Sequence, residues 1–487
     1  MASFFIFKKV FLPFKVSSMF IKQLYTGCIS EAAYYVESNG EAAIVDPLRD
    51  IDVYLELAHE RKAKIKYIFE THFHADFVSG HVDLGKVTDA PIVYGPGTVT
   101  KFPAHIARDG ERFKIGDLTI EVLHTPGHTL ESTCYLLKDE TGKDRCVFTG
   151  DTLFVGDVGR PDLAQKANEI TTEDLAGMMY DSLQSKIVPL ADDVIVYPAH
   201  GPGSSCGKNL GPDTDSTIGV EKQFNYALKA TSRKDFIKLV TDGIQPPPLY
   251  FPINAKINKE GYDSLDEVLE HGMKALSLEE FKKLLNEDIV ILDTRNSSEF
   301  TQGFIPDSIS IGLDGRFAEW AGSLLPFDSP LLLISDPGKE KESIIRLARV
   351  GLDKVQGYLE GGYETWKKSG EPIDLIIDIE ADELMMDIPF DKNLVVLDVR
   401  KTVEYAEGHL SDAINIPLSE MTDPASMANI EERHNVYVHC AGGYRSVIAA
   451  SLLKRQGIHN IRNIAGGWGE IKKQDKAEIV KEASVLN

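Results

Sequence analysis

The sequence predicts an α/β protein of about three domains. Its 487 residues are too many for one ordinary hydrophobic core, since a domain usually contains about 150 residues. The N-terminal half alternates short apolar strands with loops and helices, and the C-terminal half carries one sequence pattern twice, 105 residues apart. A hydrophobic content of 43% and a charged content of 26% are typical of a soluble globular protein.

The composition argues against several classes of function. The formal net charge of -23 disfavours a nucleic-acid-binding protein, because phosphate contacts need a basic surface. No apolar run approaches the roughly 18 residues of a membrane-spanning helix. The 5 cysteines are odd in number and have no repeating spacing. We therefore expect no disulfide framework and a reducing, cytoplasmic location.

The first domain is predicted at 19–255. Its apolar strands are expected at 42–47, 67–69, 118–123, 133–137, 146–148 and 194–197. The stretch 243–252 is too rich in proline for a helix or a central strand, so it ends the domain, and 256–273 is expected to be a linker. Residues 1–18 are expected to be a disordered or targeting extension, or to be untranslated if translation begins at Met19.

The C-terminal half is predicted to contain two α/β units, at 274–372 and 373–487. Residues 293–295 of the first unit match residues 398–400 of the second. The strands expected are 289–292 and 331–335 in the first unit and 394–397 and 436–440 in the second. In each unit the later strand runs through a short loop into a helix, an order that indicates a parallel sheet with helices on its faces.

Histidines and aspartates gather at the ends of the predicted strands of the first domain. Three histidines and one aspartate lie within 71–81, directly after an apolar run. Three later strands are followed by loops that contain His128, Asp151 and His200. One such loop alone is more often a capped turn, but four of them at successive strand ends indicate a metal site.

Residues 19–255 resemble the metallo-β-lactamase superfamily, which implies an αβ/βα sandwich. Dinuclear members of the glyoxalase II type carry the motif His-x-His-x-Asp-His, whose aspartate and last histidine hold a second metal. In this chain the last position is Phe77, and a phenyl ring cannot bind a metal. The resemblance therefore implies a mononuclear centre.

The persulfide dioxygenase branch of this superfamily has such a centre, and the resemblance assigns its iron ligands to His72, His128 and Asp151. Two histidines and one carboxylate are also the ligand set of non-haem Fe(II) oxygenases, whose open positions bind O2 and substrate. We expect one Fe(II) per chain, for which Zn could substitute. The residues expected to orient these ligands, or to be vestiges of a second site, are His74, Asp76 and His200. A direct ligand role for His74 stays open.

Two further residues are candidates for handling the substrate. Arg160 could pair with a carboxylate or phosphate of a thiol substrate, or it could be an ordinary surface arginine. Cys206 lies in the Gly/Ser-rich loop 201–207, where an exposed cysteine could carry sulfur close to the metal. Because it resembles the loop cysteine of persulfide dioxygenases fused to rhodaneses, we assign Cys206 a catalytic role.

The second repeat carries a nucleophile motif. Cys440 ends a predicted strand and opens the loop 440–446, which precedes the helical run 447–455. Backbone N–H groups at a helix N-terminus form an anion cradle, and together with Arg445 they favour the thiolate. The loop closely resembles the rhodanese active-site loop, whose cysteine accepts a sulfane sulfur. The residues expected to bind substrate in the loop are Gly442, Gly443 and Tyr444.

The first repeat departs from this motif. Ser335, or Asp336 with a slip of one residue, stands where the second repeat has Cys440, and Glu340 replaces Arg445. Neither a hydroxyl nor a carboxylate can carry a sulfane sulfur. We expect this repeat to space or orient the other domains.

The order of the domains resembles that of persulfide dioxygenase-sulfurtransferase fusions. The resemblance implies that O2 oxidises a persulfide of glutathione, coenzyme A or a similar thiol to sulfite, as in sulfide detoxification. Cys440 would then transfer sulfane sulfur to sulfite and form thiosulfate. Two alternatives stay open: a glyoxalase II-like zinc thioester hydrolase with a sulfurtransferase module, and a non-catalytic sulfur carrier or sensor. We expect no nucleic-acid or membrane partner, and a homo-oligomer.

Overall fold

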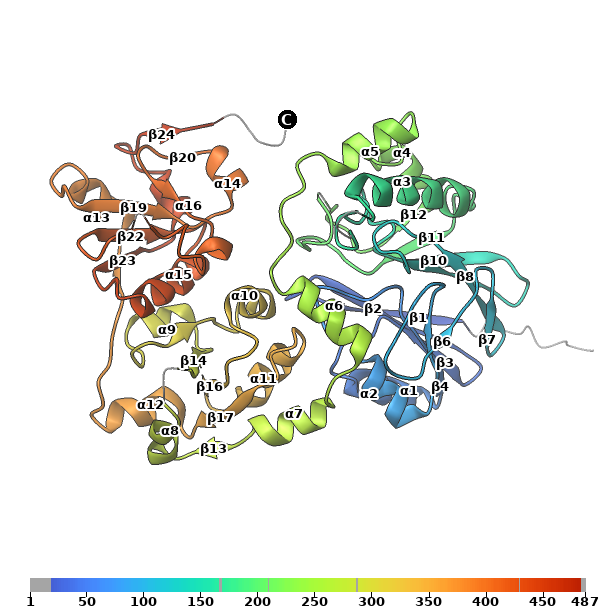
Figure 1. Ribbon diagram of the computed structural model, residues 1–487, viewed down its shortest axis with the longest axis horizontal. Coiled ribbons are helices and arrows are strands. Elements are labelled where there is room, and N and C mark those ends of the chain that lie inside the picture. Colours follow the sequence, from blue (N-terminus) through green and yellow to red (C-terminus); the bar gives the residue numbers. More distant parts are fainter. Residues whose placement is uncertain (1–18, 166–168, 209, 286–287, 429, 483–487) are drawn as a thin grey trace, which may run out of the picture.

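The computed structural model describes residues 19–165, 169–208, 210–285, 288–428 and 430–482. The extension predicted at 1–18 lies outside these ranges. The described chain forms one region with two sheets and two regions with one larger sheet each, and the first repeat lies between the N-terminal domain and the second repeat (Figure 1). The predicted α/β class and the three-part organisation are therefore present.

The N-terminal domain contains two six-stranded sheets. The first sheet consists of β1 (Phe20–Thr26), β2 (Glu31–Ser38), β3 (Glu41–Val45), β4 (Lys64–Phe69), β5 (Ile92–Tyr94) and β6 (His105–Ile106). The second sheet consists of β7 (Arg112–Ile115), β8 (Leu118–His124), β9 (Thr133–Lys138), β10 (Asp144–Gly150), β11 (Ile195–Pro198) and β12 (Ser216–Thr217). All six strands expected from apolar runs are present, while β1, β2 and several short edge strands go beyond that expectation.

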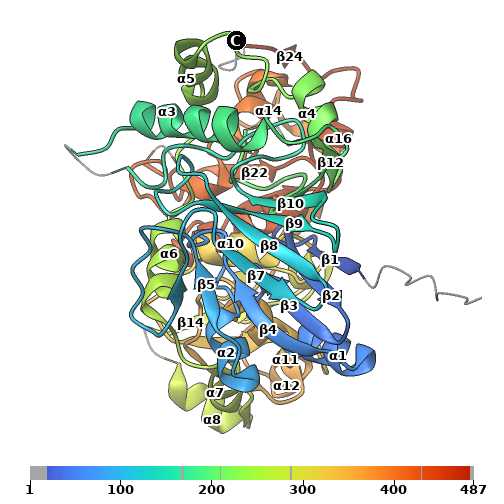
Figure 2. The ribbon, with the colours of Figure 1, turned by 90° about the vertical axis from the view of Figure 1, so that its right-hand side faces the viewer.

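Helices cover the outer faces of both sheets (Figure 2). The helices over the first sheet are α1 (Asp52–Arg61) and α2 (His81–Thr88). Those over the second sheet are α3 (Thr172–Ser182), its continuation as the π-helix η1 (Leu183–Ile187), α4 (Ile218–Phe224) and α5 (Arg233–Thr241). A capping box at Thr171 and Asp174 fixes the start of α3, because each side chain satisfies a backbone N–H of the other residue. The layers thus follow the order helix, sheet, sheet, helix.

The inner faces of the two sheets share an aromatic core. Phe69 of the first sheet packs against Tyr135 of the second, with ring centroids 4.8 Å apart, and Tyr34 packs against Phe148 at 5.0 Å. Burial of each such ring contributes about 1.5–3 kcal/mol to stability. This core holds the strand ends that carry the histidine and aspartate loops.

The segment 256–273, expected to be a linker, is mostly helical. It contains most of α6 (Phe251–Glu260) and all of α7 (Leu265–Gly272). Pro252 lies in the first turn of α6, where the missing N–H of proline leaves no hydrogen bond unmade. The proline content of 243–252 argued against a helix there, and this expectation was wrong for Phe251 and Pro252, which belong to α6. Asn258 of α6 donates to the carbonyls of His74 and Phe77 at 2.7 Å each. The helix therefore fixes the stretch 71–81, which contains the three histidines.

Each repeat contains a five-stranded sheet whose strands are all parallel, as predicted. The strands of the first repeat are, in spatial order, β13 (Ala275–Leu276), β17 (Val355–Leu359), β16 (Leu331–Ile334), β14 (Val290–Asp293) and β15 (Ile309–Ser310). Those of the second are β18 (Ile377–Ile379), β23 (Ile461–Ile464), β22 (Asn435–His439), β19 (Leu394–Asp398) and β21 (Ile414–Asn415). The short strands β20 (His409–Leu410) and β24 (Ile479–Val480) form a separate antiparallel pair.

The remaining helices belong to the two repeats. Those of the first are α8 (Leu278–Leu284), α9 (Ser297–Thr301), α10 (Phe317–Leu324), α11 (Glu340–Ala348) and α12 (Gly362–Lys368). Those of the second are α13 (Ala381–Asp387), α14 (Thr402–Ala406), the 3-10 helix η2 (Leu418–Glu420), α15 (Tyr444–Arg455) and α16 (Trp468–Ile471). No helix in the described ranges is both long and apolar enough to cross a membrane.

Two reciprocal ion pairs join the N-terminal domain to the first repeat. Arg49 binds both carboxylate oxygens of Asp353 at 2.7 and 2.8 Å, and Arg349 binds both of Asp50 at 2.8 Å. The N–H of Val78, within the stretch 71–81 that contains the three histidines, donates to the carbonyl of Arg349 at 2.7 Å. The side chain of Arg49 is fully buried. The first repeat therefore directly contacts the stretch 71–81, which carries His72.

The first repeat also contacts the second. The N–H of Ser310 in β15 donates to Ser451 Oγ in α15 at 3.0 Å, and Arg455 of α15 donates to the carbonyl of Asp307 in the first repeat at 3.0 Å. Helix α15 begins at the Cys440 loop, so the helix that carries this loop rests on the first repeat. The repeat without a cysteine thus touches the structural supports of both candidate sites.

Candidate functional site

The predicted metal ligands come together in the N-terminal domain. His72 follows β4, His128 follows β8 and Asp151 follows β10. One potential ligand atom from each residue lies within 4.8 Å of the other two, and all three side chains are buried. Strand ends that are far apart in the sequence therefore deliver the three residues to one point.

The hydrogen bonds of these residues leave their facing atoms free. His128 Nδ1 donates to the carbonyl of Arg160 at 2.8 Å, which leaves a lone pair on Nε2. Asp151 Oδ2 lies 3.4 Å from His128 Nε2 and 3.8 Å from His72 Nε2. His128 Nε2 and Asp151 Oδ2 have no hydrogen-bond partner within the described chain. Buried acceptors that face one another without a donor are costly unless a cation lies between them, so this group fits a metal ion.

His200 holds Asp151 in place. Its Nδ1 lies 2.7 Å from Asp151 Oδ1, and its Nε2 lies 2.7 Å from Asp76 Oδ2. Burial alone would lower the pKa of His200, but the charges of Asp151 and Asp76 outweigh it and raise that pKa well above its ordinary value. The hydrogen bond from His200 fixes one oxygen of Asp151 and leaves the other for the metal. Asp76 and His200 thus occupy positions from which they orient a ligand.

His74 belongs to a different cluster. Its Nε2 lies 3.0 Å from Asp46 Oδ1 and 3.6 Å from Glu70 Oε2, and the three residues form a second buried group. Asp46 also accepts hydrogen bonds from the N–H and the hydroxyl of Thr71, at 2.8 and 2.9 Å. Since Thr71 precedes His72, this cluster supports the backbone from which His72 projects.

Sequence reasoning did not single out Asp46 and Glu70. Both are carboxylates at or just beyond the C-terminal ends of strands, namely β3 and β4. The same signal led to Asp151, so it could also have indicated these two residues. They belong to the group of His74 and not to the group of His72, His128 and Asp151.

Phe77 occupies the motif position at which dinuclear relatives have a histidine. Its side chain is fully buried, and its ring centroid lies 4.3 Å from that of His74. It packs in an apolar cluster that includes Phe154 and extends into the first repeat. An apolar ring therefore fills the space that a ligand of a second metal would need.

Cys206 is buried, so the expectation of an exposed loop cysteine was wrong. Its side chain is 1% exposed and packs in the apolar cluster shared with the first repeat. Burial, and after it the charges of Asp76 and Asp151, raise the pKa of the Cys206 thiol well above its ordinary value. Its Sγ nevertheless lies within 4.8 Å of ligand atoms of Asp76 and His200. The Gly/Ser-rich composition suggested an open loop, and only the tertiary structure shows that Cys206 belongs to an apolar cluster shared with the first repeat.

The guanidinium of Arg160 is already engaged, which corrects its expected role in substrate binding. It pairs with both carboxylate oxygens of Asp162, at 2.7 and 2.8 Å, and donates to the carbonyl of Ser205 at 3.2 Å. Its backbone carbonyl instead accepts the hydrogen bond from His128 Nδ1. Arg160 therefore positions a candidate metal ligand.

The Cys440 loop has the geometry of an anion cradle. Cys440 follows β22, and its Sγ accepts a hydrogen bond from the N–H of Gly443 at 3.1 Å. Gly443 has a φ of +117°, a conformation that favours glycine. A methyl group added at Gly442 or Gly443 would meet no atom within 4 Å, so the backbone of the loop is open to a ligand. The loop leads directly into the N-terminus of α15, where backbone N–H groups favour an anion.

The side chains after the glycines fix this loop. Arg445 binds both carboxylate oxygens of Glu404, at 2.6 and 2.8 Å. The Tyr444 hydroxyl donates to the carbonyl of Gly312 in the first repeat at 2.7 Å. The side chain of Tyr444, expected to bind substrate, therefore forms a contact between domains. Only the backbone of Tyr444 remains available to a ligand in the loop.

The first repeat has a hydroxyl cluster at the matching position. Ser335 follows β16 and is 3% exposed, and its Oγ lies 2.8 Å from that of Thr294 and 3.3 Å from that of Ser343. Glu340 begins α11, so a carboxylate stands where the second repeat has Arg445. The difference read from the sequence is thus also a difference in the structure.

Comparisons with known proteins agree with this division of the chain. Residues 26–200 match the family model described as the metallo-beta-lactamase superfamily, and residues 277–369 and 380–474 match that of the rhodanese-like domain. A hydroxyacylglutathione hydrolase from Tolumonas auensis is 31% identical over 224 residues, which are 40% of this chain and 80% of that protein.

Two solved structures are also similar. A metallo-beta-lactamase from Staphylococcus aureus subsp. aureus COL has a TM-score of 0.64 and 33% identity, and the match covers 70% of this chain and 99% of that chain. ETHE1 from Myxococcus xanthus has a TM-score of 0.42 and 28% identity, with 50% of this chain and 98% of that chain covered.

Proposed function

Because the chain belongs to the metallo-β-lactamase superfamily and continues into two rhodanese-like domains, we propose that it is a persulfide dioxygenase with sulfurtransferase activity. The observation that carries the proposal is a two-histidine, one-carboxylate group in the same chain as a rhodanese-type cysteine loop. An Fe(II) ion held by His72, His128 and Asp151 would supply open coordination positions for O2 and for the persulfide sulfur.

The first reaction consumes one thiol persulfide, one O2 and one water, and it yields the thiol, sulfite and two protons. The outer sulfur is oxidised and O2 is reduced, so no other oxidant is required. Residues of the chain prepare the site for this reaction. The backbone carbonyl of Arg160 is hydrogen-bonded to Nδ1 of His128, and the hydroxyl of Thr71 is hydrogen-bonded to Nδ1 of His72. These bonds direct both Nε2 atoms inward. His200 holds Asp151 so that only Oδ2 faces the group.

The second reaction takes place at Cys440. Its thiolate attacks the outer sulfur of a second persulfide, the bond between the two sulfurs of the donor breaks, and the donor leaves as a thiolate. Sulfite then attacks the outer sulfur of the Cys440 persulfide, which forms thiosulfate and restores the Cys440 thiolate. The N–H of Gly443 stabilises the negative sulfur in both resting states. Because both sites lie on one chain, sulfite forms close to its acceptor.

A zinc thioester hydrolase is the second candidate, since the relative from Tolumonas auensis is named a hydroxyacylglutathione hydrolase. The buried ring of Phe77 argues against this reading, because it removes one ligand of the second metal that such enzymes use. A sulfur carrier without turnover is the third candidate. Sulfur transfer and sulfur carriage would both require a reduced Cys440, which a reducing compartment such as the cytoplasm maintains.

Metal analysis together with an oxygen electrode tests the proposal. Purified full-length protein should contain about one iron per chain and consume O2 when glutathione persulfide or coenzyme A persulfide is added. The variant His128→Ala should lose both the iron and the O2 uptake, because only two ligands remain. Zinc in place of iron, combined with hydrolysis of a hydroxyacylglutathione, would favour the thioester hydrolase. Absence of persulfide-dependent O2 uptake by iron-loaded protein would exclude the dioxygenase.

A further inference from the structure

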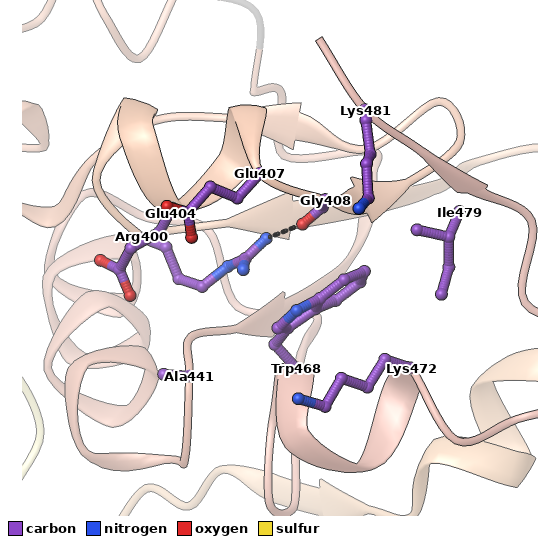
Figure 3. Close-up of a pocket in the computed structure, with 9 residues that line it drawn as sticks. All are labelled: Arg400, Glu404, Glu407, Gly408, Ala441, Trp468, Lys472, Ile479 and Lys481. Atoms are coloured by element: carbon purple, nitrogen blue, oxygen red, sulfur yellow. Dashed lines mark hydrogen bonds between the residues drawn. The ribbon is translucent and has the colours of Figure 1, made fainter. Parts of the chain in front are cut away.

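Charged side chains have very different surroundings in the second repeat and in the N-terminal domain. In the second repeat a cavity of about 530 Å³ is bordered by Lys472 and Lys481, which are exposed (Figure 3). Water can enter a cavity of this size and hydrate both charges. In the N-terminal domain, the side chains of Asp46, Glu70 and His74 form a group in which none is more than 2% exposed. Charges without access to water need a counter-charge inside the protein.

This buried group has no lysine or arginine as a counter-charge. In the described part of the chain, Asp46 is paired only with His74, and Glu70 is paired only with His74 and His81. A histidine carries a charge only when it is protonated. Two buried carboxylates therefore share two rings that are not permanent cations. A divalent cation would balance both carboxylates.

The atoms of the group that face one another also lack hydrogen bonds. Neither ring nitrogen of His74 has a hydrogen-bond partner within the described residues, and the same holds for Glu70 Oε2. Asp46 Oδ1 lies only 3.0 Å from His74 Nε2, so it must lie away from the direction in which an N–H of the ring would point. An oxygen and a nitrogen that are this close without a hydrogen bond are arranged as two ligands of one ion would be.

The separations within the group match the coordination shell of a metal. Histidine nitrogens and carboxylate oxygens bind Zn²⁺ at about 2.0–2.2 Å, so two such ligands lie roughly 2.8–3.6 Å apart at angles of about 90–110°. His74 Nε2 lies 3.0 Å from Asp46 Oδ1 and 3.6 Å from Glu70 Oε2. One ligand atom of each residue lies within 4.8 Å of the other two. One ion can therefore contact all three side chains.

We propose that Asp46, Glu70 and His74 bind a divalent transition-metal ion, for which Zn²⁺ is the best fit. One imidazole and two carboxylates are accepted ligands of Zn²⁺, which binds mixed nitrogen and oxygen sites more tightly than Mn²⁺ or Fe²⁺ does. This ion is additional to the metal of the His72 group. Its site also differs from the second site of dinuclear relatives, which is lost at Phe77. The inference does not rest on the proposed function.

The ion also has a role in the first metal group, because it positions His72. The hydroxyl of Thr71 donates to Asp46 Oδ2 at 2.9 Å, and its oxygen lies 3.0 Å from His72 Nδ1. Asp46 stays ionised when it binds a metal, so it can only accept the hydrogen bond of the hydroxyl. The hydroxyl oxygen then accepts from His72 Nδ1, which leaves the lone pair of that ring on Nε2. The second ion thus fixes the tautomer that His72 needs as a metal ligand.

Anomalous diffraction from crystals of the full-length protein locates the ion without any variant. The protein is purified with iron and zinc both supplied, and data are collected at the absorption edges of the two metals. We expect a zinc peak among Asp46, Glu70 and His74, separate from the peak of the His72 group. Absence of any metal peak among these three side chains would overturn the proposal and would show that the buried carboxylates hold protons instead.

The metal content of two variants assigns each ion to its group. Glu70→Gln keeps the shape of the side chain but removes a ligand charge, so it should lose the zinc and retain iron, whereas His128→Ala should lose the iron and retain the zinc. The matched control is Glu131→Gln, which removes a carboxylate that accepts from the N–H of Phe73 at 3.2 Å but lies outside the group. It should retain both metals. Elemental analysis after dialysis measures the result.

Circular dichroism shows whether the Glu70→Gln variant is folded. A folded Glu70→Gln protein with the parental zinc content would contradict the proposal. If this variant does not fold, the diffraction experiment on the parent protein decides alone.

The variant Asp46→Asn tests the link to His72. Its amide can donate to the Thr71 oxygen, whose hydroxyl then donates to His72 Nδ1 and leaves the ring proton on Nε2. We expect the affinity of the first group for iron to fall by about 10–100-fold, as measured by competition with a chelator. An unchanged affinity would overturn the positioning role of the second ion.

These measurements involve neither O2 nor a persulfide, so they are independent of the proposed dioxygenase. Zinc at the second group without persulfide-dependent O2 uptake would sustain the site and exclude the dioxygenase. O2 uptake by protein without a metal at this position would sustain the dioxygenase and overturn the site.

Discussion

In both repeats a buried arginine folds back onto the aspartate two residues before it, and an aromatic ring covers its guanidinium. Arg295 binds Asp293 beneath Tyr363, at 4.1 Å from the ring centre, and in the second repeat Arg400 and Trp468 form the same arrangement at 4.5 Å. The parallel sheets and this buried pair are thus common to both units. The units differ in the loop that follows the central strand of each sheet, β16 or β22.

The two units share a fold, and only a few residues of that loop decide whether the unit can carry sulfur. In the second repeat Cys440 is followed by glycines whose surroundings are open, and Arg445 is held by Glu404. In the first repeat Ser335 lies in a hydroxyl cluster, and a carboxylate begins the helix. The first repeat instead contacts its neighbours through its loops and helices. The repeat without the nucleophile thus contacts both the stretch that carries His72 and the Cys440 loop.

Removing the nucleophile tests this comparison most severely. The variant Cys440→Ser should lower thiosulfate formation by at least about 10³-fold, because a hydroxyl cannot form a persulfide. Sulfite should accumulate instead, since the metal group is unaffected. Ion chromatography of both products checks the result. The matched variant Ser335→Ala should leave both rates unchanged, and thiosulfate formation by Cys440→Ser at the parental rate would refute the role of the second repeat.

Copying the charge of the first repeat into the second should have the next largest effect. The variant Arg445→Glu reproduces Glu340 and places two carboxylates where Arg445 and Glu404 form an ion pair. A negative charge beside Cys440 disfavours its thiolate, so we expect sulfur transfer to fall on the order of 10²-fold. The rate of alkylation of Cys440 by iodoacetamide measures the thiolate directly. An unchanged alkylation rate would show that the arginine is only structural.

The interface between the repeats can be tested at Gly315. A methyl group added there would lie 2.3 Å from the ring of Tyr444, so Gly315→Ala should destabilise the protein by about 1–3 kcal/mol. Thermal unfolding measures the loss, and the alkylation rate of Cys440 should change with it. Gly27→Ala is the control, because a methyl group there meets no atom within 4 Å. Equal unfolding temperatures for both variants would show that the first repeat does not support the loop.

Much of the fold could be predicted from local signals. The apolar runs indicated strands such as β10 and β22, because a buried strand is usually a short continuous run of apolar residues. The pattern at Asp293 and Asp398 indicated the repeat. Helix α6 was not predicted, since its tolerance for Pro252 depends on the exact position of the helix start. The strand β1 was missed because its mixed composition, with Lys22 and Gln23, resembles a surface loop.

The candidate site could be predicted in part. The resemblance to the metallo-β-lactamase superfamily assigned His128 and Asp151 to one metal group, and the structure brings both residues together with His72. Cys206 is buried in an apolar cluster that also contains residues of the first repeat, which begins at residue 274. The pairing of Arg160 with Asp162 could not be predicted either, because an arginine close to an aspartate in the sequence need not bind it. Partners supplied by tertiary structure leave no local pattern.

The smallest effect is expected at the contact through which the first repeat reaches the Cys440 loop. The variant Tyr444→Phe keeps the ring against Gly315 and removes the hydroxyl that donates to Gly312. Loss of one hydrogen bond of this kind costs about 0.5–1.5 kcal/mol. The ring still fills its space, so unfolding should shift less than in Gly315→Ala.

The same variant separates anchoring from catalysis. If the hydroxyl only anchors the loop, the alkylation rate of Cys440 and the KM for the persulfide should stay within about twofold of the parental values, because the backbone cradle is intact. If instead Tyr444 binds the substrate, the KM should rise while the unfolding temperature stays constant. Measuring both quantities on one preparation decides whether the first repeat acts on the second site through structure or whether the tyrosine belongs to the chemistry, as its place in the loop first indicated.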